Sequence, residues 1–138
     1  MLIRGNAVEV TDNKLIKRAK RVAKAHKAST DVKTGRVGCA LITNKNHVYT
    51  GVSIEASCGI GFCAEHSAIA SMATNREYSI KRIVAVSSNG TILPPCGRCR
   101  ELMYQINNKN LDTEIVIGKG KATKLRDLLP EVWQKRFY

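Results

Sequence analysis

The sequence is poor in acidic residues, aromatic residues and long apolar segments, and each shortage bears on the partners that the protein can have. Acidic residues number 11 against 23 lysines and arginines, a formal net charge of +12 that raises the question of an anionic partner. Aromatic side chains make up 5% of the chain, so a stacking platform for single-stranded nucleic acid is not evident. No stretch approaches the roughly 20 consecutive apolar residues of a membrane span, and we expect no membrane partner.

No targeting signal is visible in the sequence. Residues 1–5 are not followed by the apolar segment of a secretory signal peptide, so a cytoplasmic location is expected. In a reducing compartment, the five cysteines point to metal binding or reactive thiols rather than to disulfides. The length of 138 residues and the 43% hydrophobic content predict a single domain over residues 1–138 that is large enough to bury a core.

Hydrophobic periodicity predicts alternating helices and strands. An amphipathic helix with a basic outer face is expected from residue 12 until the polar residues 29–31 end it. Short β-branched segments predict a hairpin and two later strands, at residues 37–43, 48–54, 82–88 and 114–117. Further helices are expected at residues 62–73, 96–106 and 125–129. This order predicts an α/β fold, a three-layer α/β/α sandwich whose mixed sheet opens with a hairpin.

Three cysteines provide the strongest functional signal. Cys63 stands at the start of one predicted helix, and Cys96 and Cys99 stand three residues apart at the start of another. Residues three apart share a helix face, and helix N-termini favour the thiolate form. Because one strand separates the two helices, their starts come side by side and the three sulfurs form a site suited to zinc. Cys39 and Cys58 lack this arrangement and are expected to be buried as small apolar residues.

The fourth zinc position distinguishes a catalytic site from a structural one. His66 lies three residues after Cys63 and could close a Cys₃His site, as structural zinc requires. Glu65 lies between them in the first helical turn, where its carboxyl group can face a zinc-bound water. A structural site has no need of this acid, so the pattern favours a catalytic site that keeps one position open.

Cys-Ala-Glu at residues 63–65 and Pro-Cys-Gly-Arg-Cys-Arg at residues 95–100 resemble the zinc-dependent cytidine deaminase family. The similarity is greatest to its small homotetrameric type and to the related blasticidin-S deaminases, and it extends from the hairpin at residues 37–52 to Leu-Leu-Pro at residues 128–130. It implies a cytidine deaminase-like fold and a zinc cofactor on Cys63, Cys96 and Cys99. It also implies a homotetramer, a role in pyrimidine salvage, and hydrolytic deamination with Glu65 as the proton shuttle.

The resemblance also implies roles for three side chains around the sulfurs. Arg100 follows the second cysteine of the pair and is expected to donate hydrogen bonds to the sulfurs, which would offset their negative charge. His66 stands where cytidine deaminases commonly have arginine, and its expected role is a weaker form of the same tuning. Arg98, between the two cysteines, is more typical of blasticidin-S deaminases.

Substrate contacts are carried over from the same resemblance. Glu55 takes the position of a family glutamate that binds the sugar, and Ser53 takes the place of its asparagine partner. Ala64, inside the motif, is the third expected contact. An aromatic residue of typical cytidine deaminases is replaced around residues 35–36, so Trp133 is expected to supply the stacking contact, in this subunit or a neighbouring one. The alternative for Trp133 is that it seals the terminal helix.

Three hypotheses for function follow. The first is deamination of cytidine or deoxycytidine, with blasticidin S or another aminopyrimidine nucleoside as the alternative substrate. The second, of another class, is a basic nucleic-acid-binding module with a structural Cys₃His zinc site. The third keeps the chemistry but takes RNA or DNA, and it ranks low because polynucleotide deaminases typically use histidine as the first ligand where this chain has Cys63. A small nucleoside is therefore the expected partner.

Overall fold

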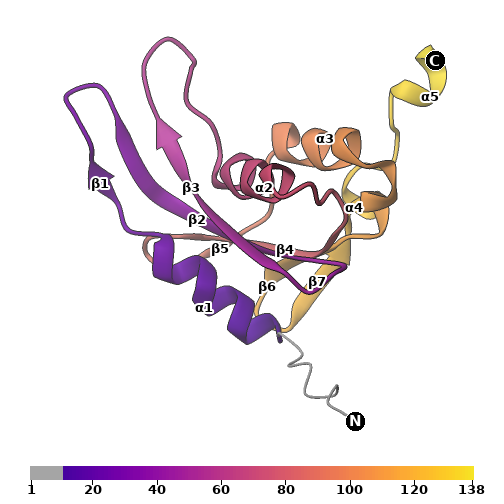
Figure 1. The fold of residues 1–138 in the computed structure, drawn as a ribbon, viewed down its shortest axis with the longest axis horizontal. Coiled ribbons are helices and arrows are strands. Elements are labelled where there is room, and N and C mark those ends of the chain that lie inside the picture. The colour runs from indigo at the N-terminus through magenta and orange to yellow at the C-terminus, as the bar shows by residue number, and fades with distance from the viewer. Residues whose placement is uncertain (1–10) are drawn as a thin grey trace.

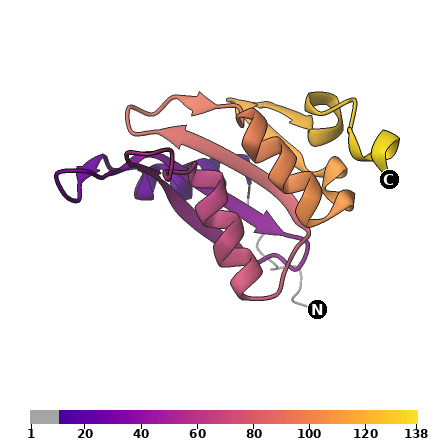
Figure 2. The same ribbon diagram turned by 90° about the horizontal axis from the view of Figure 1, so that it is seen from above.

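The computed structural model describes residues 11–138 as a seven-stranded mixed sheet between two layers of helices (Figures 1 and 2). This arrangement confirms the predicted three-layer α/β/α sandwich. Residues 1–10, on which the expected lack of a signal peptide depends, lie outside the described residues. None of the helices in residues 11–138 has the length and apolar character that crossing a membrane requires.

The sheet has the order β1-β2-β4-β6-β7, with β3 paired to β2 and β5 paired to β4. Its strands are β1 (His26–Lys27), β2 (Lys33–Thr43), β3 (Val48–Glu55), β4 (Ile80–Ser87), β5 (Ile92–Leu93), β6 (Glu114–Gly118) and β7 (Lys121–Lys124). Strands β4 and β6 are parallel, and the other pairs are antiparallel. The predicted opening hairpin is therefore present, as β2 and β3, and the parallel pair follows it.

Helices cover both faces of the sheet, α1 below it and α2 and α3 above it in Figure 1. The helices are α1 (Asp12–Val22), α2 (Ala64–Thr74), α3 (Gly97–Ile106), α4 (Leu125–Leu128) and α5 (Gln134–Phe137), with a 3₁₀ turn, η1 (Asn108–Asp112). Successive residues of β2 serve the two cores, since Cys39 and Leu41 pack with α2 and α3 while Ala40 and Ile42 pack with α1. This period of two is the alternation of a strand buried on both faces.

The first helix is shorter than the periodicity predicts. It ends at Val22, and His26 and Lys27 form β1 against Thr34 and Lys33 instead of a further turn. A Cβ at Gly38 would lie 2.3 Å from the carbonyl oxygen of Ala19, so the last turn of α1 sits directly on β2. The chain therefore leaves the helix and turns back along the strand. Strands β5 and β7 and helix α5 also go beyond the sequence prediction.

A buried carboxylate, Glu77, ties the segment after α2 to the β2–β3 hairpin. Its Oε2 lies 2.6 Å from both the Nδ1 of His47 and the hydroxyl oxygen of Tyr49, and the side chain is 6% exposed. Burial alone would raise the pKa of Glu77, but hydrogen bonds from Thr43, Tyr49 and His47 outweigh it and lower that pKa to about 2. The fold therefore stabilises the ionised form.

Glu77→Gln is expected to lower the free energy of unfolding by about 2 kcal/mol at pH 7, because the charge-assisted hydrogen bonds are lost. Because the pKa of Glu77 is lower in the folded state than its ordinary value of 4.5, the ionised group stabilises the fold at pH values above 4.5. That contribution disappears as the pH falls toward 2. Urea denaturation of both proteins should therefore show a difference that shrinks across this interval. Glu131→Gln, which removes an exposed pair with Arg136, is the control and should change stability little. A difference independent of pH would contradict the assignment.

Candidate active site

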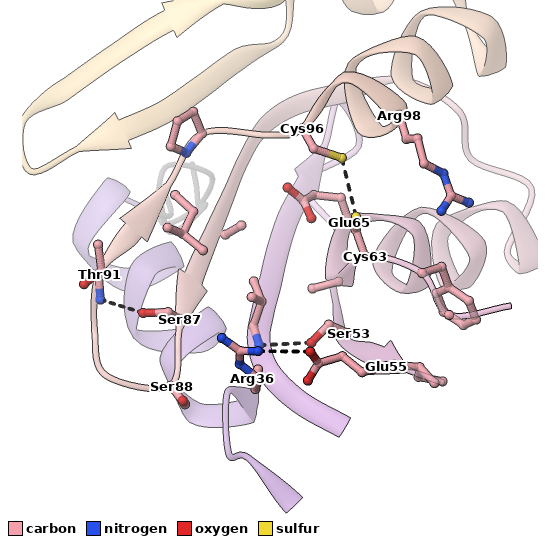
Figure 3. Close-up of a pocket in the computed structure, with 18 of the residues that line it drawn as sticks. Arg36, Ser53, Glu55, Cys63, Glu65, Ser87, Ser88, Thr91, Cys96 and Arg98 are labelled. Atoms are coloured by element: carbon pink, nitrogen blue, oxygen red, sulfur yellow. Dashed lines mark hydrogen bonds and ion pairs between the residues drawn. The ribbon is translucent and has the colours of Figure 1, made fainter. Parts of the chain in front are cut away.

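Three cysteine sulfurs meet where two helices begin. Cys63 and Cys96 are the N-caps of α2 and α3, and Cys99 lies in the first turn of α3. The Sγ of Cys96 lies 3.5 Å from the Sγ of Cys63 and 3.5 Å from that of Cys99, and all three lie within 4.8 Å of one another. Figure 3 shows Cys63 and Cys96 facing each other across the helix starts. Within residues 11–138 this is the only cluster of potential metal ligands so arranged.

The chemistry of these donors fits zinc. Three sulfurs are the soft ligands that a tetrahedral zinc site uses, and they leave its fourth position open. Burial, together with the negative charge of Glu65, raises the pKa of the Cys99 thiol. Burial works in the same direction on Cys96, but hydrogen bonds from the Cys99 backbone and the neighbouring thiols outweigh it and lower that pKa. A cation among the sulfurs overcomes the raised pKa of Cys99, because a coordinating thiol loses its proton.

His66 contacts the sulfur cluster from one side. Its Nδ1 lies 3.4 Å from the Sγ of Cys99. Among the described residues, neither ring nitrogen joins the three sulfurs that lie within 4.8 Å of one another. Burial and the nearby charge of Arg98 lower the pKa of His66, which favours the neutral imidazole. A neutral ring can donate one hydrogen bond to a thiolate. This geometry does not support the closed Cys₃His site considered from the sequence.

Glu65 lies beside the sulfurs in the first turn of α2. It is 5% exposed and, in Figure 3, its carboxyl group lies next to Cys63 and Cys96. Burial raises the pKa of Glu65, and hydrogen bonds from its own backbone N–H and from Cys99 only partly offset this. A carboxyl group with a raised pKa can both accept and return a proton near neutral pH.

A cavity of about 740 Å³ opens in front of Cys63, Cys96 and Glu65, and this volume is large enough for a small organic ligand. The structure brings most of the predicted site residues to its wall, namely Ser53, Glu55, Cys63, Ala64, Glu65, Cys96 and Arg98. Figure 3 places Glu65 at one end and Ser53 and Glu55 at the other. The hydroxyl of Ser53 accepts a hydrogen bond of 3.0 Å from the Val37 N–H, so part of its capacity is used within the protein.

Two predicted residues lie away from the cavity of their own chain, and stacking by Trp133 in a neighbouring subunit stays a prediction. Trp133 is not among the described residues that line this cavity. It directly precedes α5, which leads away from the sheet in Figure 1, and its Nε1 donates a hydrogen bond to Glu101. Arg100 donates to the carbonyl oxygens of Pro95 and Leu128, at 2.9 and 3.2 Å, and among the described residues it makes no hydrogen bond to a sulfur. Its side chain therefore holds the loop before Cys96 rather than the thiols.

The two remaining cysteines differ from each other. Cys39 is fully buried in the core, as expected, and burial raises its thiol pKa. Cys58 is exposed, with φ +62° in the turn between β3 and α2, so the expectation that it is a buried apolar residue was wrong.

Sequence reasoning missed one side of the cavity. It is formed by Arg36, by Ser87 at the end of β4, and by the turn between β4 and β5, from which Ser88, Asn89 and Thr91 line the wall. Asn89-Gly90, with φ +92° at the glycine, is the dipeptide typical of a tight hairpin and was the available signal for this turn.

Comparison with known proteins assigns the family. Residues 9–114 match the model described as the cytidine and deoxycytidylate deaminase zinc-binding region. The chain is 33% identical to the cytidine deaminase of Mycoplasma genitalium over 97 residues, covering 69% of this chain and 72% of that protein. For the cytidine deaminase of Mycobacterium tuberculosis the values are 28% over 98 residues, with 70% and 71% covered.

A solved structure agrees with the sequence comparison. The crystal structure of cytidine deaminase from Mycobacterium leprae matches with a TM-score of 0.74 and 27% identity, covering 89% of this chain and all of that one. The chain belongs to the cytidine and deoxycytidylate deaminase family and is a zinc-binding, hydrolytic deaminase.

Proposed function

We propose that the protein deaminates cytidine or deoxycytidine to the corresponding uracil nucleoside and ammonia. The observation that carries the proposal is the buried carboxyl of Glu65 beside three convergent cysteine sulfurs at one end of a nucleoside-sized cavity. Membership of an enzyme family favours this reading over a basic nucleic-acid-binding module. The expected homotetramer and the expected cytoplasmic location stay predictions.

Glu65 moves the protons of the reaction. Zinc held by Cys63, Cys96 and Cys99 supplies the Lewis acidity that makes water a nucleophile near neutral pH. Glu65 takes a proton from the water that attacks C4 of the cytosine ring and gives it to the adjacent ring nitrogen. It then takes the proton of the new C4 hydroxyl and gives it to the amino group, so that the C4–N bond breaks, the C4 carbonyl forms and ammonia leaves. The raised pKa of Glu65 suits a group that must be protonated and deprotonated in each cycle.

The opposite end of the cavity holds the sugar. Glu55 and Ser53 lie there, and a carboxylate and a hydroxyl are suitable partners for sugar hydroxyl groups. Ala64 gives the ring a small apolar neighbour next to Glu65. Arg98, which stands between Cys96 and Cys99 in the sequence, lines the same cavity. Because the Cys-Gly-Arg-Cys sequence resembles that of blasticidin-S deaminases, blasticidin S is the alternative substrate to test.

The test is steady-state turnover by the zinc-loaded protein. Cytidine, deoxycytidine and blasticidin S are supplied separately, and ammonia release is measured together with the loss of cytosine absorbance. We expect turnover of cytidine or deoxycytidine with a kcat in the range of about 1–1000 per second that is common for enzymes. Turnover of blasticidin S alone would replace the proposed substrate. Ammonia release from none of the three would contradict the substrate class.

A further inference from the structure

Strand β2 contains a bulge where it passes the cavity. Thr34 stands opposite Ile54 of β3, but Gly38 stands opposite Val52, so residues 35–37 face the single residue Ser53. Gly35 has φ +80°, and a Cβ on it would lie 2.0 Å from the carbonyl oxygen of Lys24. Only glycine fits this backbone, and the bulge is therefore built into the sequence.

The bulge directs Arg36 to the cavity wall. Its Nη1 lies 3.0 Å from the Oε2 of Glu55, the last residue of β3, and both side chains line the cavity (Figure 3). The carbonyl oxygen of Arg36 accepts a hydrogen bond of 2.7 Å from the Ser88 N–H, which fixes the bulge to the turn between β4 and β5. On its other side, the Val37 N–H donates to the Ser53 hydroxyl. The backbone of this segment is thus held from both directions.

We propose that Arg36 is a positioning residue that determines which sugar the enzyme accepts, and that it acts by fixing the Glu55 carboxylate. This inference rests on the proposed function. The guanidinium engages Oε2, and the remaining lone pairs of the carboxylate accept a hydrogen bond from a hydroxyl group of the substrate sugar. A carboxylate held in one orientation loses less conformational entropy when the sugar binds than a free side chain does.

The position of the pair indicates binding rather than chemistry. In Figure 3, Arg36 and Glu55 lie at the end of the cavity away from Cys96 and Glu65, so Arg36 has no contact with the reacting atoms. Its effect should therefore appear in KM and not in kcat. The effect should also depend on the substrate, because a nucleoside without the 2′- and 3′-hydroxyl groups cannot donate to Glu55 from those positions.

The experiment compares cytidine with 2′,3′-dideoxycytidine. For Arg36→Ala we expect the KM of cytidine to rise about fivefold with kcat unchanged within twofold. The inhibition constant of 2′,3′-dideoxycytidine, measured by competition against cytidine, should change less than twofold. Arg36→Lys should recover part of the loss, since an ammonium group retains the charge but not the planar geometry of guanidinium.

A double-mutant cycle tests whether Arg36 acts through its partner. In a Glu55→Ala background, adding Arg36→Ala should cause no further rise in the KM of cytidine. Arg126→Ala is the matched control, because it removes an exposed arginine–carboxylate pair, with Asp112, that is absent from the cavity wall. Equal effects of Arg36→Ala on both ligands, or an effect that persists without Glu55, would overturn the inference. A wild-type enzyme that turns over neither cytidine nor deoxycytidine would instead contradict the proposed function.

Discussion

Glu65→Gln is expected to lower kcat for cytidine by about 10²- to 10⁴-fold, the usual contribution of a positioned proton-transfer group. The amide has nearly the same shape as the carboxyl group and fits the buried site in the first turn of α2. It cannot accept the proton of water and return it to the ring. The variant should therefore stay folded, keep its zinc and bind cytidine, and lose turnover alone.

Three measurements separate this result from general damage. Zinc content by atomic emission and the thermal unfolding midpoint should match those of the wild type, while single-turnover conversion of cytidine is nearly abolished. Glu131→Gln, an exposed acid outside the cavity, serves as the matched control and should keep full activity. Turnover at the wild-type rate by Glu65→Gln would show that another group carries the proton.

Cys99→Ala is expected to remove both zinc and activity. Outer partners of metal ligands typically contribute about 10- to 100-fold to metal affinity, so loss of a ligand itself should exceed about 100-fold. The sulfur of Cys99 is fully buried and lies against Cys96 and His66, and within residues 11–138 only Cys63 and Cys96 share its cluster of potential metal ligands. Zinc affinity is measured by competition with a chromophoric chelator, and the unfolding midpoint should fall because bound metal stabilises the folded state.

Cys39→Ala provides a control of equal burial. Cys39 and Cys99 both have no exposed surface and both belong to the same core, so each substitution removes one buried sulfur. Cys39→Ala should lose some stability through packing but retain stoichiometric zinc and turnover. Zinc loss in both variants, or in neither, would mean that the metal is not held by the three sulfurs at the starts of α2 and α3.

The metal cluster could be predicted from the sequence because its determinants are local. Cys63, Cys96 and Cys99 are placed by helix starts, and helix starts follow from capping position and periodicity within a few residues. The strand between the two helices then brings those starts together by topology alone. The position of Glu65 could be predicted from the same segment, because Glu65 is the second residue of the helix that Cys63 caps.

The sugar end of the cavity depends on features that hydrophobic periodicity in the sequence does not predict. Arg36 reaches the wall only because a bulge shifts the register of β2 by two residues relative to β3. The bulge in turn depends on Gly35 meeting Lys24 in the segment between α1 and β1. The place of Trp133 could not be predicted for a different reason, and its expected contact in a neighbouring subunit stays a prediction. Its placement depended on the resemblance alone, and the contact of its indole with Glu101 is a tertiary one.

The hydrogen bonds of Arg100 connect the C-terminal segment to the loop that precedes Cys96. One guanidinium joins the carbonyl oxygen of Pro95, directly before Cys96, to that of Leu128 at the end of α4. A fragment trimmed before Leu128 would remove one of the two partners of this arginine and loosen the loop that ends at Cys96. Tyr138, by contrast, is 89% exposed. A purification tag is therefore better added after Tyr138 than substituted for part of the C-terminal segment.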